Sequence, residues 1–139
     1  MTRIDFYVVT DSGVDARLNV AVRLADKALA AGHRVLINTH DESQATALDG
    51  LLWSLRPASF LPHALLGTDD TSPIQVGWGQ DPGEHNDVLI NLNSSPAVFF
   101  SRFARVAEVV TQDPVQIESM RDAWRFYRDR GYPLTKHDL

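Results

Sequence analysis

Two carboxylates flank a predicted turn near the N-terminus, and their spacing could serve metal-assisted chemistry. Asp11 and Asp15 follow the apolar run Ile4–Val9. In an α/β protein this turn is where a glycine-rich loop brings a phosphate to a helix N-terminus. The turn has one glycine, Gly13, and lacks both the three-glycine dinucleotide fingerprint and the Gly-Lys-Ser/Thr of a phosphate loop. Because two carboxylates would repel an anion unless a metal intervened, we interpret the segment as a helix entry with Asp or Ser caps.

A second polar cluster surrounds His85, which lies near Asp81, Glu84 and Asp87. Such a loop could bind a metal ion through oxygen ligands if it folded over, but a solvated polar turn is the favoured interpretation. The five histidines never recur at the spacing that places two ligands on one helix face. There is also no Gly-x-Ser-x-Gly elbow. The sequence therefore predicts no metal site, no cofactor and no catalytic activity.

The last amphipathic segment, about Val115–Arg130, carries arginines around apolar side chains. Seen down the axis of the expected helix, an arc of about 100° holds five of these arginine and apolar side chains. They are Ile117, Arg121, Trp124, Arg125 and Arg128. The adjacent arc is expected to face the sheet. It holds Met120, Ala123 and Tyr127. Guanidinium groups offer forked donors to carboxylates and an indole offers apolar area, so the first arc predicts a surface for a short acidic, aromatic peptide.

Two other interpretations of this face stay open. Arg121 and Arg125 could pair with Asp122 and Asp129, or with nothing, on a solvated face, as is common for basic helices. That interpretation explains the arginines but not Trp124, because an indole among charges needs a pocket or a partner. Binding of nucleic acid ranks third, since three arginines lie in an acidic protein.

A second candidate contact segment runs from Leu51 to His63. Its bulky and ring-bearing side chains can belong to the core or anchor a partner, and the sequence leaves these two interpretations balanced. They are Trp53, Phe60, Leu61, Pro62 and His63. Trp53 falls off the apolar stripe of its helix, and Phe60 lies on a loop bracketed by prolines.

Strand patterns alternate with helix patterns along the chain. Strands are expected at Ile4–Val9, Val35–Ile37, Ile74–Trp78, Val88–Leu92 and Val106–Val110. Helices are expected at about Val14–Ala31, at about Ala97–Phe103, and at about Val115–Arg130 before Gly131. A further helix is expected after Asp41, which would cap it, with the apolar stripe Ala45, Leu48, Leu52 and Leu55. Residues 56–73 are expected to form a pinned loop, and the alternation in Ile74–Trp78 predicts a half-exposed strand. The fold class is α/β: one three-layer, Rossmann-like domain over residues 1–139, with a mostly parallel sheet of about five strands and helices on both faces.

Composition excludes several classes of protein. The 139 residues include 13 Lys+Arg, 18 Asp+Glu and no Cys, with a net charge of −5. The chain thus has neither the clustered basic residues of a phosphate-backbone binder nor a cysteine zinc site, and no apolar run approaches a membrane span. No signal-peptide pattern precedes the first strand, so a cytoplasmic protein without membrane contact is expected. Residues 118–139 are the exception to the acidic balance, with five basic and four acidic side chains.

The order of several segments resembles the chi subunit family of bacterial DNA polymerase III. These segments are Asp5-Phe6-Tyr7, Arg34–Ile37, Leu52-Trp53 with Ser59–His63, Asp87–Leu92, and Arg125–Arg128 with Gly131-Tyr132. They are collinear with the family over essentially the whole chain. The Ser-Phe-Leu-Pro-His and Tyr-Arg-x-x-Gly-aromatic segments are the more specific ones, whereas the strands are generic.

The resemblance implies a non-catalytic accessory subunit of the replicative clamp loader, without direct sequence-specific DNA binding. Members pair with the psi subunit and, on another surface, hold the acidic, phenylalanine-ended tail of single-stranded-DNA-binding protein. Arg121, Trp124 and Arg125 match the tail-binding positions, and Val110 matches an apolar wall. Phe60 matches a residue of the psi-binding surface. Trp53 is expected to lie close to that residue.

Two departures from the family pattern affect the tail site. Ile117 stands where a familiar member has a basic residue, and Trp124 replaces a tyrosine. We expect a tether in which the terminal aromatic enters a pocket floored by Val110, Ile117 and Trp124, while Arg121 and Arg125 meet the carboxylates. The competing hypotheses are a small α/β nucleotide-binding protein or enzyme acting at the first strand–helix turn, and a generic adaptor whose Phe60 surface serves other partners.

Overall fold

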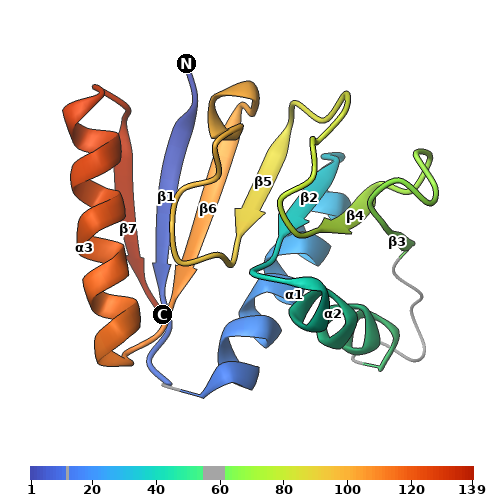
Figure 1. The fold of residues 1–139 in the computed structure, drawn as a ribbon, viewed down its shortest axis with the longest axis horizontal. Coiled ribbons are helices and arrows are strands. Elements are labelled where there is room, and N and C mark those ends of the chain that lie inside the picture. The colour runs from blue at the N-terminus through green and yellow to red at the C-terminus, as the bar shows by residue number, and fades with distance from the viewer. Residues whose placement is uncertain (12, 55–61) are drawn as a thin grey trace.

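The computed structural model describes residues 1–11, 13–54 and 62–139, in which seven parallel strands form one sheet (Figure 1). The strands are β1 (Arg3–Val8), β2 (Val35–Asn38), β3 (His63–Leu65), β4 (Ile74–Gly77), β5 (Val88–Asn91), β6 (Arg105–Val110) and β7 (Leu134–Asp138). The helices are α1 (Val14–Ala30), α2 (Glu42–Ser54), α3 (Pro114–Asp129) and a 3-10 turn, η1 (Phe100–Arg102). The strand order is β3-β4-β2-β5-β6-β1-β7, and every pairing is parallel.

Side chains alternate between two apolar layers, one on each face of the sheet. In β2, Val35 and Ile37 pack with α1 and α2, whereas Leu36 points to the other face. That second face is covered by α3 and by the aromatic segment around η1. The α/β class with helices on both faces is therefore confirmed.

The carboxyl ends of all the strands meet at one edge, the lower edge in Figure 1, because the sheet is wholly parallel. The helices α1, α2 and α3 each begin at this edge after β1, β2 and β6. Two of the three carry their own cap: Asp41 accepts from the backbone N–H of Gln44 at 2.8 Å, as predicted, and Asp113 accepts from that of Val115 at 2.9 Å. The Asp or Ser cap expected for α1 is not observed: the cap residue is Gly13, which has no side chain to accept such a bond.

The expected sheet was too small by two strands, both at its edges. β3 lies inside the segment expected to be a loop, and β7 reads Leu134-Thr135-Lys136-His137-Asp138, which has little apolar character. Each edge strand has a single neighbour, β4 or β1, so its sequence needs little of the hydrophobic pattern that marks a central strand.

Two further expectations were wrong in detail. Ile74–Gly77 is buried throughout rather than half exposed, because Gln75 satisfies its amide internally: Nε2 donates to the carbonyls of Asp69 and Ser72. The predicted helix at about Ala97–Phe103 is only the turn η1. The expected stripe of α2 is confirmed at Ala45, Leu48 and Leu52, whereas Leu55 lies outside the described residues.

Candidate protein-interaction site

Helix α3 is defined at both ends by residues that suit those positions. Asp113 caps the first turn, and Pro114 occupies the first helical position, where a missing N–H costs nothing. Gly131 follows the helix with φ +81°, a backbone conformation that favours glycine. The helix can therefore present a fixed outer face.

The inner face of α3 is anchored by Tyr127, which is fully buried. Its hydroxyl donates to Oε2 of Glu108 at 2.6 Å, and its ring meets that of Phe6 edge-on at 6.0 Å. Ala123 is also buried, so two of the three residues predicted to face the sheet are in the core, and Met120 packs partly against it. The helix is thereby held at a fixed rotation about its own axis.

Glu108 is the buried acid beneath this helix. It lies wholly within the protein and accepts from Nδ2 of Asn91 at 3.0 Å as well as from Tyr127. Burial disfavours its charged form and raises the pKa of Glu108 to about 7, although both hydrogen bonds and the more distant Arg17 oppose the shift.

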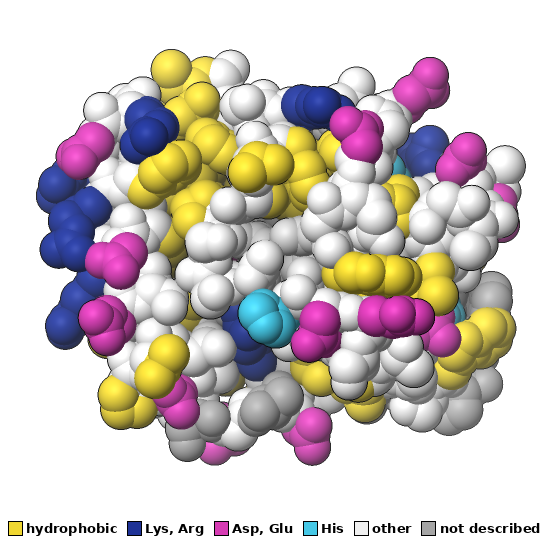
Figure 2. Space-filling view, in the orientation of Figure 1, with side chains coloured by type: hydrophobic (Ala, Val, Ile, Leu, Met, Phe, Trp, Pro, Cys, Tyr) yellow, Lys and Arg dark blue, Asp and Glu magenta, His cyan; other side chains and the backbone are white. Residues whose placement is uncertain are grey.

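The outer face of α3 carries an open, shallow groove of about 490 Å³. Its lining includes Ile117, Arg121 and Arg125, three of the predicted tail-binding residues. Arg121 is exposed and makes no hydrogen bond or ion pair with any residue of the described ranges. Figure 2 shows Lys and Arg side chains gathered along the left edge of the molecule, where α3 lies.

The other two arginines have acidic neighbours, in line with the competing interpretation. Arg125 pairs with Asp122 one turn away, and Arg128 pairs with the adjacent Asp129 at 3.1 Å. Arg128 does not line the groove with Arg121. All these side chains are more than half exposed, so their ion pairs are worth little and can be exchanged for a partner's carboxylates.

Trp124 has an intramolecular partner, which the sequence did not anticipate. Its half-buried ring lies 5.2 Å from that of Phe6 in the layer between α3 and the sheet. The indole is therefore explained by packing, and only its remaining exposed edge is available for contact at the border of the basic face.

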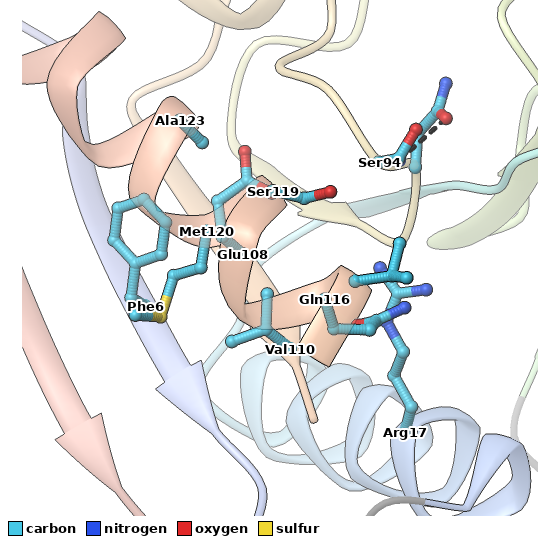
Figure 3. A pocket seen from close by; sticks show the side chains of 11 residues that line it. Phe6, Arg17, Ser94, Glu108, Val110, Gln116, Ser119, Met120 and Ala123 are labelled. Carbon is cyan, nitrogen blue, oxygen red and sulfur yellow. Dashed lines mark hydrogen bonds between the residues drawn. The ribbon is translucent and has the colours of Figure 1, made fainter. Parts of the chain in front are cut away.

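Val110 does not join the groove that contains Ile117. It lines a separate small cavity of about 50 Å³ between α3 and the carboxyl edge of the sheet, together with Phe6 and Met120 (Figure 3). The expected single pocket floored by Val110, Ile117 and Trp124 is therefore not formed; the structure brings together Ile117, Arg121 and Arg125 only.

The second candidate surface is centred on Trp53, whose side chain is 56% exposed on α2. Its ring meets that of His63 edge-on at 4.9 Å, and Nε2 of His63 lies 3.1 Å from Asp49. Pro62 is partly buried beside them. Phe60 and Leu61 lie outside the described residues, so the structure bears on only part of this prediction.

The polar clusters considered for metal chemistry are dispersed. Asp81 pairs with Arg102, while His85 turns inward, where its Nε2 lies 3.0 Å from Oε1 of Gln75 and burial lowers its pKa. Asp11 and Asp15 are exposed. Within residues 1–11, 13–54 and 62–139, no three His, Asp or Glu side chains are grouped as metal ligands.

Comparison with known proteins decides the family. Residues 1–135 match the family model described as DNA polymerase III chi subunit, HolC. A Pseudomonas aeruginosa protein named DNA polymerase III subunit chi is 47% identical over 139 residues, which cover all of this chain and 98% of the relative. The chain belongs to the DNA polymerase III chi subunit family. The chi subunit of Escherichia coli is 31% identical over 142 residues, with 97% of each chain covered.

The chi-family fold is shared with larger proteins of low sequence identity. The crystal structure of T4 UvsW matches 99% of this chain and 41% of its own, at 10% identity and a TM-score of 0.73. Mss116p DEAD-box helicase domain 2 bound to an RNA duplex matches 97% of this chain and 64% of its own, at 12% identity and a TM-score of 0.64. The chain therefore spans less than two thirds of either structure, and at these identities the likeness concerns the fold alone.

Family membership confirms the resemblance and assigns the chain to a replication accessory subunit rather than to an enzyme. No helix within the described part of this chi-family chain is long and apolar enough to span a bilayer.

The sequence interpretation missed two buried charged residues that the structure places at the carboxyl edge. Arg17 is only 9% exposed, and its Nε donates to the carbonyl of Val109 at 2.7 Å. Burial lowers the pKa of Arg17, and the electrostatic effect of Glu108 partly offsets this shift. The sequence pattern did contain a signal for the burial of both residues. Arg17 precedes Ala21, Leu24 and Ala28 at helical spacing, and Glu108 interrupts an apolar strand.

Proposed function

We propose that this chi-family subunit is a physical connector in the clamp-loader complex. The outer face of α3 holds the acidic C-terminal tail of single-stranded-DNA-binding protein, and the Trp53 surface holds the psi subunit. The observation that carries the proposal is Arg121, an exposed arginine with no partner in the described ranges, beside Ile117 in one groove.

The chemistry of the groove supports a peptide that combines negative charge with apolar area. Arg121 and Arg125 offer forked donors for carboxylates, and Ile117 offers an apolar contact between them. Asp122 and Glu118 also line the groove, so the net field is modest and a partner must displace Asp122 from Arg125. A small contact of this kind has an expected affinity in the micromolar range, about −8 kcal/mol. Many tails on a coated strand would raise the effective concentration.

The proposed psi surface combines an exposed indole with a packed histidine. Trp53 is the large exposed apolar side chain of α2, and large aromatic residues are frequent anchors of interfaces. The edge-on contact with His63 fixes the ring before a partner arrives, which reduces the entropy lost on binding. Phe60 and Leu61 are proposed to belong to the same surface.

Calorimetry with the tail peptide tests the first contact. We expect Arg121→Ala to weaken binding by about tenfold and Arg125→Ala by somewhat less, because Arg125 must first leave Asp122. Arg128→Ala should weaken binding least, since Arg128 does not line the groove.

Arg23→Ala is the matched control, because it removes the same charge from an exposed position of α1. If Arg121→Ala and Arg125→Ala bind the peptide as well as the unmodified protein does, the proposed tail site is wrong.

Co-purification with psi tests the second contact and separates it from a generic adaptor role. Trp53→Ala should abolish recovery of psi, whereas the neighbouring exposed Ser54→Ala should not. Retention of psi by Trp53→Ala would show that the Trp53 surface is not the psi interface. We further propose a cytoplasmic location, in keeping with a replication subunit. No separate nucleotide-dependent activity at Asp11 and Asp15 is proposed, since family membership favours the accessory role.

A further inference from the structure

A second cavity lies at the carboxyl edge of the sheet, outside the proposed tail and psi surfaces. Its volume is about 460 Å³, and it is bordered by the first turns of α1, α2 and α3. It contains Gly13, the cap residue of α1, together with Arg17 from α1, Gln44 from α2 and Gln116 from α3. This volume falls within the range of small-molecule sites, and the carboxyl edge of a parallel sheet is where such sites form in α/β folds.

Arg17 is the first element that points to a ligand. It is the one Lys or Arg among the described lining residues, and nine-tenths of its surface is buried. The bond from Nε to the carbonyl of Val109 fixes the guanidinium plane. Its two terminal nitrogens make no hydrogen bond to any residue of the described part of the chain. Figure 3 shows the side chain reaching from α1 toward Gln116.

The two glutamines are oriented so that their donor ends are free. Oε1 of Gln44 accepts from the backbone N–H of His40 at 2.7 Å, and Oε1 of Gln116 accepts from that of Thr111 at 3.3 Å. Because an N–H must meet the oxygen of the amide, each NH₂ group is left as the unoccupied end. Neither NH₂ group has a partner among the described residues.

Hydroxyl groups add to this excess of donors. Ser94 and Thr111 both line the cavity, and Oγ1 of Thr111 accepts from the N–H of Asp113, so its hydrogen remains available. The first turn of α1, without a side-chain cap, contributes the positive end of a helix dipole. The arrangement offers more donors than the two oxygens of a carboxylate can accept.

Two acids lie near the cavity and are already engaged. Asp113 lines it, but its Oδ1 accepts from the N–H of Val115 as the cap of α3. Glu108 lies in the smaller cavity behind Arg17, where Asn91 and Tyr127 donate to it. Neither acid forms an ion pair with Arg17 at contact distance.

We propose that this cavity binds the phosphate group of a small phosphate monoester through Arg17, Gln44 and Gln116. A phosphate presents three oxygens and up to two charges to a donor-lined site, which matches the set on these three side chains. A nucleic-acid backbone fits less well, because its binding depends on a track of several Lys and Arg side chains. The described lining of this cavity includes a single such residue, Arg17. The proposal is independent of the tail and psi contacts.

Nuclear magnetic resonance titration of the whole protein tests the proposal. Inorganic phosphate and adenosine 5′-monophosphate are added separately, and the side-chain signals of Arg17, Gln44 and Gln116 are followed. Both probes should cause saturable shifts of these signals, whereas adenosine should cause none. The double variant Gln44→Glu with Gln116→Glu should weaken binding by at least about tenfold, since it replaces two donors by carboxylates.

The double variant keeps both oxygen acceptors and places acids in the first turns of α2 and α3, where they favour the helix, so folding should be retained. Gln80→Glu is the control for the substitution itself: it adds one such charge outside the cavity and keeps its bond from the N–H of Trp78. Unchanged binding by the double variant, or no saturable shift, would overturn the proposal. An oligonucleotide with hydroxyl ends that binds as tightly as the monophosphate would overturn the small-molecule assignment. Arg121→Ala, on the proposed tail surface, should leave phosphate binding unchanged.

Discussion

Arginine serves two regions of this molecule in opposite ways. On the outer face of α3, Arg121 and Arg125 are exposed on a shallow groove, and Arg125 forms an exposed ion pair with Asp122. At the carboxyl edge, Arg17 is buried and its guanidinium is fixed by the carbonyl of Val109. The first region suits a flexible acidic chain that arrives and leaves, and the second suits a compact anion of fixed shape.

Exposure sets the strength and the salt dependence of each of these two cationic sites. Exposed pairs are screened by ions within about 10 Å at ordinary salt, so their contribution is small and is lost as salt is added. A buried guanidinium is screened less, and each hydrogen bond to it is stronger. Both regions depend on α3, which carries Arg121 on one side and Gln116 at its first turn.

The largest effect is expected from removing the shared support of both regions. Tyr127→Ala deletes a fully buried ring and should lower the free energy of unfolding by about 3–5 kcal/mol, measured by chemical denaturation. Tyr127→Phe, which loses only the bond to Glu108, should cost about 1–2 kcal/mol. Equal losses in the two variants would mean that the ring does not anchor the helix.

The next effect is a pH dependence that originates in Glu108. Its folded pKa of about 7 exceeds the unfolded value of 4.5, so the folded state holds the extra proton between these pH values. Its contribution to the free energy of unfolding is therefore present below about pH 4.5 and is lost as pH rises to about 7. The loss is of order 3 kcal/mol. Glu108→Gln should be more stable relative to the unmodified protein at pH 8 than at pH 4.5. A constant difference across this range would contradict the assigned pKa.

A smaller effect is expected on the phosphate cavity when the one carboxylate among its described lining residues is neutralised. Asp113→Asn should keep the helix cap, because Asn and Asp cap equally well, and should strengthen phosphate binding by about three- to tenfold. Tail binding should not change. Weaker phosphate binding in this variant would show that Asp113 contributes to the site rather than opposing it.

The smallest effect is expected from the matching change on the exposed face. Asp122→Asn frees Arg125 and should strengthen tail binding by about two- to threefold, measured by calorimetry at low salt. The gain should disappear at high salt, because the pair is exposed. A gain as large as that of Asp113→Asn at the cavity would erase the contrast between the two regions.

Most of the architecture follows from the sequence because central parallel strands and amphipathic helices carry strong periodic signals. Asp41 and Gly131 marked element ends correctly, and Ala123 and Tyr127 were placed on the inner face of α3. The edge strands β3 and β7 were missed, since an edge strand needs no apolar pattern on both faces.

The site was predicted only in part, for reasons of three-dimensional packing. A helical wheel places Ile117, Arg121 and Trp124 on one arc, but it cannot show that Phe6 lies under the indole. It also cannot show that Val110 opens into a different cavity. Arg17 was overlooked because a charged residue beside an apolar stripe is ordinarily solvated, and its burial depends on β6 supplying the carbonyl of Val109.

Chemical-shift mapping with the tail peptide on the labelled protein shows directly whether the outer face of α3 binds the tail. The largest shifts should fall on Ile117, Arg121 and Arg125, with a smaller shift of the Trp124 indole N–H. The cavity at Arg17 and the ring of Trp53 should be unaffected. Shifts concentrated at Trp53 or at Arg17, with the outer face of α3 unchanged, would contradict the proposed tail site.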